Sequence, residues 1–312
     1  MHYYHAFGLK LESALPLPEL QRGSGPADVV IDFADGEHHD RNERWLSGAG
    51  EHVTLHLDDI VFTVEGGRSV RIAAPPGTGD NDIRLWLLGT VMATLLHQRG
   101  YFPLHANSVL LASGGVAAFS GPSGAGKSTM AALLDRQEFR VLGDDLCAIR
   151  LDGEQRPMVY GGIPRLKLWQ ATLDLFGRAR DGLEPVASDY DKFHVPLDAV
   201  QEVGSLDPRP LERLYLLGAR DSDDEPLIQP LRGILAADGV LDNAFRWTIG
   251  QSVAGENSRV QFDQAMAIAR KIAVFRVARR WGTDQLFEEG ALIAAHLSSP
   301  LTNKAAAGGV GS

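Results

Sequence analysis

The sequence predicts an α/β protein with a small β-rich domain at its N-terminus, and three observations lead to this fold class. First, short apolar runs separated by glycine, proline or charged residues fill the first 79 residues, a pattern typical of strands and turns. Second, strands and helices alternate from about residue 80 onwards, as they do in an α/β layer. Third, a length of 312 residues is typical of about two domains.

The N-terminal domain is predicted to span residues 1–79. Its expected strands are residues 3–11, 28–33, 52–57, 60–65 and 69–73. Apolar and polar residues alternate most clearly in the third run, and Asp58 and Asp59 separate it from the fourth as a tight turn. Proline and glycine in residues 74–79 (APPGTG) break any element, so the boundary is placed there.

The second domain is predicted to span residues 80–300, followed by a flexible tail of small residues at 301–312. It begins with a helix at 82–99, where apolar residues recur at helical spacing before Gly100. The next expected strands and helices are residues 109–112, 115–120, 127–136, 140–143 and 147–151. A strand at 214–217 and two helices at 261–269 and 283–296 complete this domain.

Composition excludes several classes of partner. The formal net charge of −10 and a pI near 5.5 argue against nucleic acid or an anionic membrane surface. The most apolar run, residues 85–96, is shorter than the roughly 18 residues of a membrane span, and the N-terminus lacks the features of a secretory signal. Cys147 is the only cysteine, so we expect it in the core and the protein in a reducing cytoplasm.

The strongest local signal is the octapeptide GPSGAGKS at residues 121–128, which fits the P-loop pattern G-x-x-x-x-G-K-[ST] between a strand and a helix. Its glycines let backbone amides turn towards phosphate oxygens, and the helix start adds its positive dipole end. Lys127 is expected to reach the β- and γ-phosphates of ATP, with the Ser128 hydroxyl on Mg²⁺. The predicted nucleotide-binding residues are Gly121, Ser123, Gly124, Ala125, Gly126, Lys127, Ser128 and Thr129.

Two adjacent carboxylates, Asp144 and Asp145, follow the apolar run at 140–143. We expect this run to be the strand next to the P-loop strand, which brings both carboxylates to the carboxyl edge of the sheet beside the phosphates. One aspartate can hold Mg²⁺ while its neighbour accepts a proton from an attacking hydroxyl. His105, ahead of the strand before the P-loop, is placed to orient a carboxylate there, although a lone histidine in an apolar run is more often structural.

Residues 104–149 resemble the catalytic domain of the HPr kinase/phosphorylase family. That family has a histidine ahead of the P-loop strand, a GxSGxGKS loop and an Asp-Asp pair one helix and one strand later, and all three features are matched here. The resemblance implies a P-loop HPr-kinase-like catalytic domain that transfers the γ-phosphoryl group of ATP to a serine hydroxyl. It also implies Asp144 as the base and Asp145 with Ser128 as ligands of Mg²⁺.

The rest of the chain departs from that family. Thr129 follows the loop where bacterial HPr kinases usually carry an acidic residue, and the downstream segments E-[IV]-R-G-x-G and P-x-x-P-G-R-N are missing. In place of these segments, the chain has residues 161–169 (GGIPRLKLW) and 191–196 (DKFHVP). This combination resembles the HPr-kinase-like proteins encoded with ribosomally made peptides, including the lasso-peptide precursor kinases, which phosphorylate a C-terminal serine.

A phosphoryl-transfer site needs cations because negative charge spreads over the equatorial oxygens of the transferring group. Four basic residues are candidates: Arg165, Lys167, Lys192 and Arg259. Lys192 is the first choice as a catalytic residue because it lies in a charged turn before an extended segment. The basic stretch at 269–281 indicates a solvated face, and residues 38–40 (HHD) lack partners with metal-ligand spacing.

The sequence therefore predicts an ATP- and Mg²⁺-dependent serine kinase that phosphorylates a ribosomally made precursor peptide at a C-terminal serine. Two alternatives stay open: a kinase or phosphorylase of an HPr-like phosphocarrier protein, and a non-catalytic nucleotide-dependent regulator. The aspartate pair favours an enzyme, because a switch needs a magnesium ligand but has no evident use for an adjacent base. The N-terminal domain is the expected place of peptide recognition, and formation of a homo-oligomer stays open.

Overall fold

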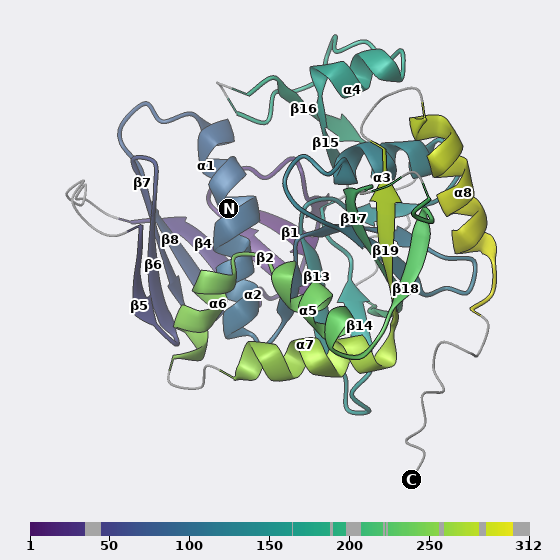
Figure 1. Cartoon of the computed structure of the whole chain (residues 1–312). Coiled ribbons are helices and arrows are strands. Elements are labelled where there is room, and N and C mark those ends of the chain that lie inside the picture. The colour runs from purple at the N-terminus through teal and green to yellow at the C-terminus, as the bar shows by residue number, and fades with distance from the viewer. Residues whose placement is uncertain are drawn as a thin grey trace.

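The structure is a computed structural model with two large β-sheets, a two-stranded sheet and helices on their faces (Figure 1). It describes residues 1–34, 45–163, 165–187, 190–197, 207–220, 222, 224–255, 259–280 and 285–301. The α/β class predicted from the sequence is confirmed.

The first sheet is built from residues 2–73. Its strands are β1 (His2–Ala6), β2 (Leu9–Ser13), β3 (Gln21–Arg22), β4 (Val29–Phe33), β5 (Leu46–Ala49), β6 (His52–Leu57), β7 (Ile60–Glu65) and β8 (Ser69–Ala73), in the spatial order β3-β1-β2-β4-β8-β7-β6-β5. The predicted strands between residues 28 and 73 are confirmed. The single strand predicted at 3–11 is wrong, because Phe7 and Gly8 adopt φ of 55° and 73° and turn the chain into a β1–β2 hairpin.

The turn between β6 and β7 follows directly from local chemistry. Leu57 pairs with Ile60, which leaves Asp58 and Asp59 as a two-residue loop. Asp58 has φ of 55°, a left-handed conformation that aspartate tolerates better than most residues. The Asp58 carboxylate also accepts a hydrogen bond from Trp86 Nε1 at 2.8 Å, which ties the hairpin to the helix above it.

A continuous helical segment lies across one face of this sheet (Figure 1). It comprises α1 (Asp80–Trp86), the π-helical turn η1 (Leu87–Val91) and α2 (Met92–Gln98), so the predicted helix at 82–99 is confirmed. Ile83, Leu87 and Leu95 are buried in the same apolar core as the strands of the first sheet. The boundary predicted at residue 79 therefore falls between the first sheet and a helix that completes the core of that sheet.

The second sheet has three parallel strands at its centre. Its strands are β9 (Phe102–Leu104), β10 (Ala106–Leu110), β11 (Val116–Ser120), β12 (Val141–Gly143), β13 (Cys147–Leu151), β14 (Pro157–Tyr160), β17 (Arg209–Ala219), β18 (Ile228–Leu231) and β19 (Ala273–Arg279). The main path is β12-β10-β11-β17-β14-β13-β9, with β19 paired to both β17 and β18. Strands β11, β17 and β19 run parallel.

The expected adjacency of the run 140–143 to the strand before the glycine-rich loop is wrong, because β10 lies between β12 and β11. However, β10 is antiparallel to both of these strands. Strands β11 and β12 therefore run in the same direction and end at the same edge of the sheet. That shared edge brings the residues after β12 close to the loop after β11.

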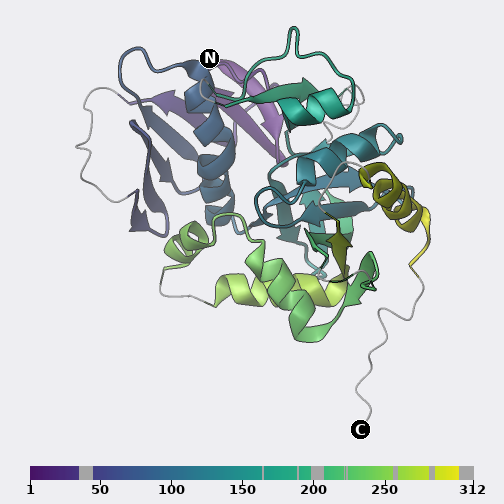
Figure 2. The same ribbon diagram turned by 45° about the horizontal axis from the view of Figure 1, so that its top comes forward.

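Helices cover both faces of the second sheet. Helices α3 (Lys127–Asp135) and α8 (Leu286–Ser298) share an apolar core with one face, and α5 (Gly233–Asp242) and α7 (Val260–Lys271) share a core with the other. Figure 2 shows α5 and α7, in green, side by side. Two further helices, α4 (Gln170–Leu175) and α6 (Trp247–Ala254), and a hairpin of β15 (Arg165–Trp169) and β16 (Lys192–Pro196) complete the architecture. Within the described residues no helix is both long and apolar enough to cross a membrane.

His97 in α2 makes the stability of this fold sensitive to acid. Its ring is buried, with Nε2 3.3 Å from the carbonyl oxygen of Phe245 and Nδ1 3.5 Å from the side-chain nitrogen of Gln261. Burial lowers the pKa of His97 from 6.5 to about 4, and the Phe245 carbonyl offsets only part of this effect. The unfolded chain therefore binds a proton that the folded chain does not bind between these pH values, so acid favours unfolding.

We expect His97 alone to remove about 2 kcal/mol of unfolding free energy on going from about pH 7.5 to about pH 5. The stabilisation is fully present above pH 6.5 and declines as the pH falls towards 4. Urea unfolding at both pH values gives the loss of unfolding free energy for the wild type and for His97→Gln. The difference between the two losses is the contribution of His97. The exposed His52 provides a control, since His52→Gln should keep the wild-type difference. An equal loss in His97→Gln and in the wild type contradicts the prediction.

Candidate active site

The glycine-rich loop, residues 121–126, connects the end of β11 to the start of α3. Gly121, Gly124 and Gly126 have φ of 149°, 82° and 81°, values that favour glycine over residues with a side chain. A Cβ at Gly121 would lie 2.5 Å from the backbone oxygen of Leu217 on β17. Gly121 is therefore packed tightly against the neighbouring parallel strand, and a residue with a side chain does not fit at this position.

The start of α3 presents backbone amides at the carboxyl edge of the sheet. Gly126 is the N-cap in the left-handed conformation, and no side chain caps this helix. The first turn contains Lys127, Ser128 and Thr129, whose N–H groups have no partners within the helix. Ser123 and Gly124 lie exposed at the tip of the loop. Unpaired amides and the positive end of the helix dipole make this terminus suited to a phosphate group.

The ammonium of Lys127 lies over this loop. Its Nζ donates hydrogen bonds to the carbonyl oxygens of Gly121 at 2.8 Å and Pro122 at 3.1 Å. Burial is the main cause that lowers the pKa of Lys127, whereas the two nearby aspartates act to raise it. Neutral carbonyl groups therefore hold the amine at the loop. An anion can replace them, because a charged acceptor forms a stronger hydrogen bond with an ammonium group.

Asp144 follows β12 and is almost completely buried. Its Oδ1 accepts hydrogen bonds from Ser128 Oγ at 3.1 Å and from the amide of Asp145 at 3.0 Å. Its Oδ2 accepts one from the amide of Lys167 at 2.9 Å. Burial, together with the charge of Asp145, raises the pKa of Asp144. The sequence prediction pairs Ser128 with Asp145, whereas the structure brings Ser128 to Asp144.

Asp145 has a different environment. Its carboxyl group is one third exposed, and its Oδ2 accepts a hydrogen bond from Lys167 Nζ at 3.1 Å. Its Oδ1 lies 3.4 Å from His105 Nδ1. Burial acts to raise the pKa of Asp145, but Lys167 and His105 outweigh it and hold the pKa well below its usual range. Asp145 is therefore ionised at neutral pH.

His105 lies between β9 and β10, and its ring is directed at Asp145. Nδ1 faces both the carboxylate of Asp145 and its backbone oxygen, at 3.2 Å from the latter. Both groups accept hydrogen bonds, so Nδ1 carries the proton of the neutral ring. The other side of the ring contacts Phe245, with ring centroids 5.1 Å apart. Burial is the main cause that lowers the pKa of His105, which keeps the ring neutral at physiological pH.

A pocket of about 650 Å³ opens beside the glycine-rich loop. It is lined by His105, Asp145 and the first two loop residues, together with residues 242–246, which run from the last residue of α5 to the residue before α6. Arg246 ends this segment, with φ of 54°, and its charge contributes to the lowered pKa of His105. Sequence reasoning missed Arg246 and its neighbours, because they follow the loop by more than 100 residues and belong to no motif.

Of the four candidate cations, the structure brings Lys167 and Lys192 to this edge. Both lie on the β15–β16 hairpin, where Lys192 Nζ is 5.7 Å from the centre of the Trp169 ring. The positive charge of Lys192 acts to lower the pKa of both aspartates: it opposes the raised pKa of Asp144 and adds to the lowered pKa of Asp145. Arg165 instead pairs with Glu184 at 3.5 Å, and Arg259 is exposed at the start of α7.

Two buried residues hold the loop in position. Arg279, at the end of β19, donates to the carbonyl oxygen of Ala125 at 3.5 Å and pairs with Glu289 at 3.4 Å. The prediction that the basic stretch at 269–281 is a solvated face is therefore wrong at this residue, whose side chain is only 11% exposed. Asn107 on β10 is completely buried and donates its side-chain amide to the backbone oxygen of Lys127.

The remaining predictions concern cysteine and metal ligands. Cys147 is buried on β13, as predicted. Residues 38–40 lie outside the described part of the chain. Within the described part, no group of three or more His, Cys, Asp or Glu residues is arranged to hold a metal ion. The Ser128 hydroxyl and the Asp144 carboxylate together offer the hard oxygen ligands that Mg²⁺ takes when phosphates supply the others.

No protein-family model matches the chain, and no curated protein matches it either. Among solved structures, an HPr(Ser) kinase/phosphatase from Coxiella burnetii aligns with 62% of this chain and 86% of its own chain, at 10% sequence identity and a TM-score of 0.31.

Proposed function

We propose that the protein is an ATP- and Mg²⁺-dependent kinase that phosphorylates a serine hydroxyl. The observation that carries the proposal is the convergence of three groups at one sheet edge: the glycine-rich loop with Lys127, the Ser128–Asp144 pair and the Asp145–His105 pair. These are an anion site, a set of hard oxygen ligands and a partly exposed carboxylate beside a pocket. Phosphoryl transfer needs all three in one place.

The loop and the start of α3 are assigned to the phosphates of ATP. Their amides donate to phosphate oxygens, and Lys127 exchanges the carbonyl oxygens of Gly121 and Pro122 for the β- and γ-phosphates. Ser128 and Asp144 are assigned to Mg²⁺ because they are in contact at 3.1 Å. The bound ion would neutralise negative charge on the phosphates. Asp144 then serves as a ligand, and not as the base implied by the family resemblance.

Asp145 is assigned as the base because its carboxylate is ionised and lines the 650 Å³ pocket. The acceptor oxygen forms a bond to the γ-phosphorus while the bond from that phosphorus to the β,γ-bridging oxygen breaks. The hydroxyl proton passes to the Asp145 carboxylate. His105 and Lys167 orient this carboxylate, and Lys192 adds positive charge near the transferring group.

For the acceptor, we propose the C-terminal serine of a ribosomally made precursor peptide of the lasso type. The support is the position of Arg246, which lines the same pocket as Asp145. A C-terminal serine carries its hydroxyl and its carboxylate on adjacent carbon atoms. A guanidinium that lines the same pocket as Asp145 suits the second group, because arginine binds carboxylates in a bidentate manner.

The test uses the precursor peptide encoded beside the gene, incubated with the enzyme, ATP and Mg²⁺ and analysed by mass spectrometry. We expect one phosphate on the C-terminal serine, and a kcat/KM at least about tenfold lower for the same peptide with a C-terminal amide. In Arg246→Gln the free acid and the amide should react at similar rates, because the partner of the carboxylate is gone. An HPr protein serves as the competing acceptor. Phosphate on HPr alone, or equal rates for acid and amide in the wild type, contradicts the peptide proposal.

A further inference from the structure

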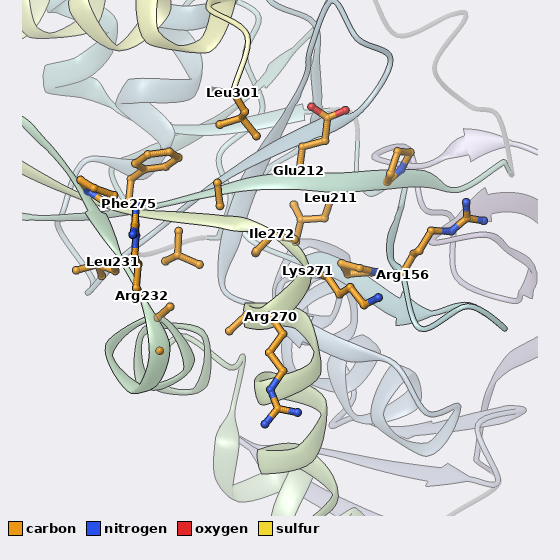
Figure 3. Close-up of a pocket in the computed structure, with 18 residues that line it drawn as sticks. Arg156, Leu211, Glu212, Leu231, Arg232, Arg270, Lys271, Ile272, Phe275 and Leu301 are labelled. Atoms are coloured by element: carbon orange, nitrogen blue, oxygen red, sulfur yellow. The ribbon is translucent and has the colours of Figure 1, made fainter. Parts of the chain in front are cut away.

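A second pocket, of about 520 Å³, is drawn in Figure 3. It lies at the opposite edge of the central sheet from the candidate active site. Leu211 and Glu212 at the start of β17 line it, together with residues 272–274 at the start of β19. The glycine-rich loop contacts the other end of β17, at Leu217. Leu211 and Leu217 are six residues apart on one strand, or about 20 Å. The proposed kinase site therefore includes no part of this pocket.

The interior of this pocket is apolar. Figure 3 shows the side chains of Leu211, Leu231, Ile272, Phe275 and Leu301 around a common space. They come from three strands, the end of α7 and the segment after α8, so no single element closes the space. A concave apolar surface of this volume is of the size that small molecules occupy, and its burial by an alkyl chain contributes about 25 cal/mol per Å² of apolar surface.

The charged side chains around the interior are mostly basic. Four cations line the pocket, namely Arg156, Arg232, Arg270 and Lys271, against the single carboxylate of Glu212. Glu212 already accepts a hydrogen bond from Ser113 Oγ at 2.9 Å. In Figure 3, Lys271 and Arg156 extend on one side of the apolar side chains and Arg232 lies on the other, while the guanidinium of Arg270 extends away.

This local positive charge contrasts with the chain as a whole, whose formal net charge is −10. Arg156 is neutralised by Asp152 at 2.8 Å and Glu154 at 3.4 Å, so it adds little to the field. Lys271 is exposed at the end of α7 and makes no ion pair within the described residues. An apolar interior with cations at its rim selects an anionic head attached to an apolar tail.

We propose that this pocket binds an amphipathic carboxylate, an unbranched alkyl chain of roughly eight to twelve carbons with one acidic end. The tail contacts Leu231, Ile272 and Phe275, and the carboxylate lies near Lys271. A free alkyl carboxylate fits better than an extended peptide, because the interior offers few side chains that could hydrogen-bond to peptide groups.

The test is calorimetric titration of the full-length protein with decanoate and, separately, with decyltrimethylammonium, which has the same tail and the opposite charge. We expect decanoate to bind at least tenfold more tightly than the cation. Lys271→Glu should weaken decanoate at least fivefold and strengthen the cation. The exposed Arg178, whose side chain is outside this pocket, gives the matched control Arg178→Glu, in which both affinities should stay at the wild-type value.

A second variant tests the apolar interior. Ala236 lies at the pocket wall on α5, so Ala236→Phe fills part of the space and should abolish decanoate binding. Its melting temperature and its affinity for ADP show whether the fold is intact. Where Ala236→Phe fails to fold, the charge reversal at Lys271 still decides the outcome. Equal binding of both amphiphiles overturns the proposal. Absence of decanoate binding also overturns it. If Lys271→Glu then changes the sedimentation coefficient, the surface is an interface between two copies of the chain.

Discussion

Asp145→Asn is expected to lower kcat for phosphoryl transfer by about 10²- to 10⁴-fold while ADP affinity stays within about threefold of the wild type. The amide cannot accept the proton of the acceptor hydroxyl. It does preserve the shape of the residue, and asparagine tolerates the left-handed φ of 74° at this position. Transfer to the peptide is measured by mass spectrometry, and ADP binding is measured by calorimetry.

Asp144→Asn should give a different result. Asp144 contacts Ser128 at 3.1 Å and is assigned as a ligand of Mg²⁺, so the amide should weaken Mg²⁺-dependent ADP binding by about tenfold or more. ADP binding without Mg²⁺ should change little. Mg²⁺-dependent ADP affinity therefore distinguishes the two variants, even where both lower the rate of phosphoryl transfer.

A surface aspartate provides the control. Asp152 pairs with Arg156 at 2.8 Å, and it lines neither pocket. Asp152→Asn should leave both transfer and ADP binding unchanged. If Asp145→Asn keeps its transfer rate while Asp144→Asn binds Mg²⁺ and ADP normally but transfers nothing, then Asp144 is the base. That outcome would restore the assignment implied by the resemblance to HPr kinases.

The parts of the structure that the sequence predicts correctly depend on local chemistry. The Asp58-Asp59 turn, the helix at 82–99 and the glycine-rich loop between a strand and a helix each follow from residues close together in the chain. Turn propensity, apolar periodicity and the absence of side chains act over a few residues. The missed turn at Phe7 and Gly8 is the exception, because its phenylalanine gives no turn signal.

The parts that the sequence does not predict depend on strand order and on distant segments. Strand β10 lies between β11 and β12, and Asp144 rather than Asp145 contacts Ser128; no local sequence pattern predicts either arrangement. Arg246 and Arg279 reach the site from segments more than 100 residues after the loop. Arg279 also belongs to a run of basic residues whose composition indicates solvent exposure, and its pairing with Glu289 offsets the cost of burial.

Gly121→Ala is expected to weaken ADP binding by about 100-fold, because a displacement of about 1 Å at a positioned loop is enough for such a loss. The new Cβ would lie 2.5 Å from the backbone oxygen of Leu217 and 3.3 Å from the Cβ of Ala125. A strand carbonyl cannot rotate away as a flexible side chain can, so the loop has to move. The φ of 149° adds backbone strain.

Gly124→Ala in the same loop is the matched control. Its φ of 82° also favours glycine, but a Cβ there has no atom within 4 Å. It carries the strain of the left-handed region, about 1–2 kcal/mol, without the collision, and should weaken ADP binding far less. Calorimetry with ADP and Mg²⁺ measures both variants, and circular dichroism checks that each is folded. Equal affinities for the two variants would mean that backbone strain alone governs the loop, and that its contact with β17 does not position the amides that bind phosphate.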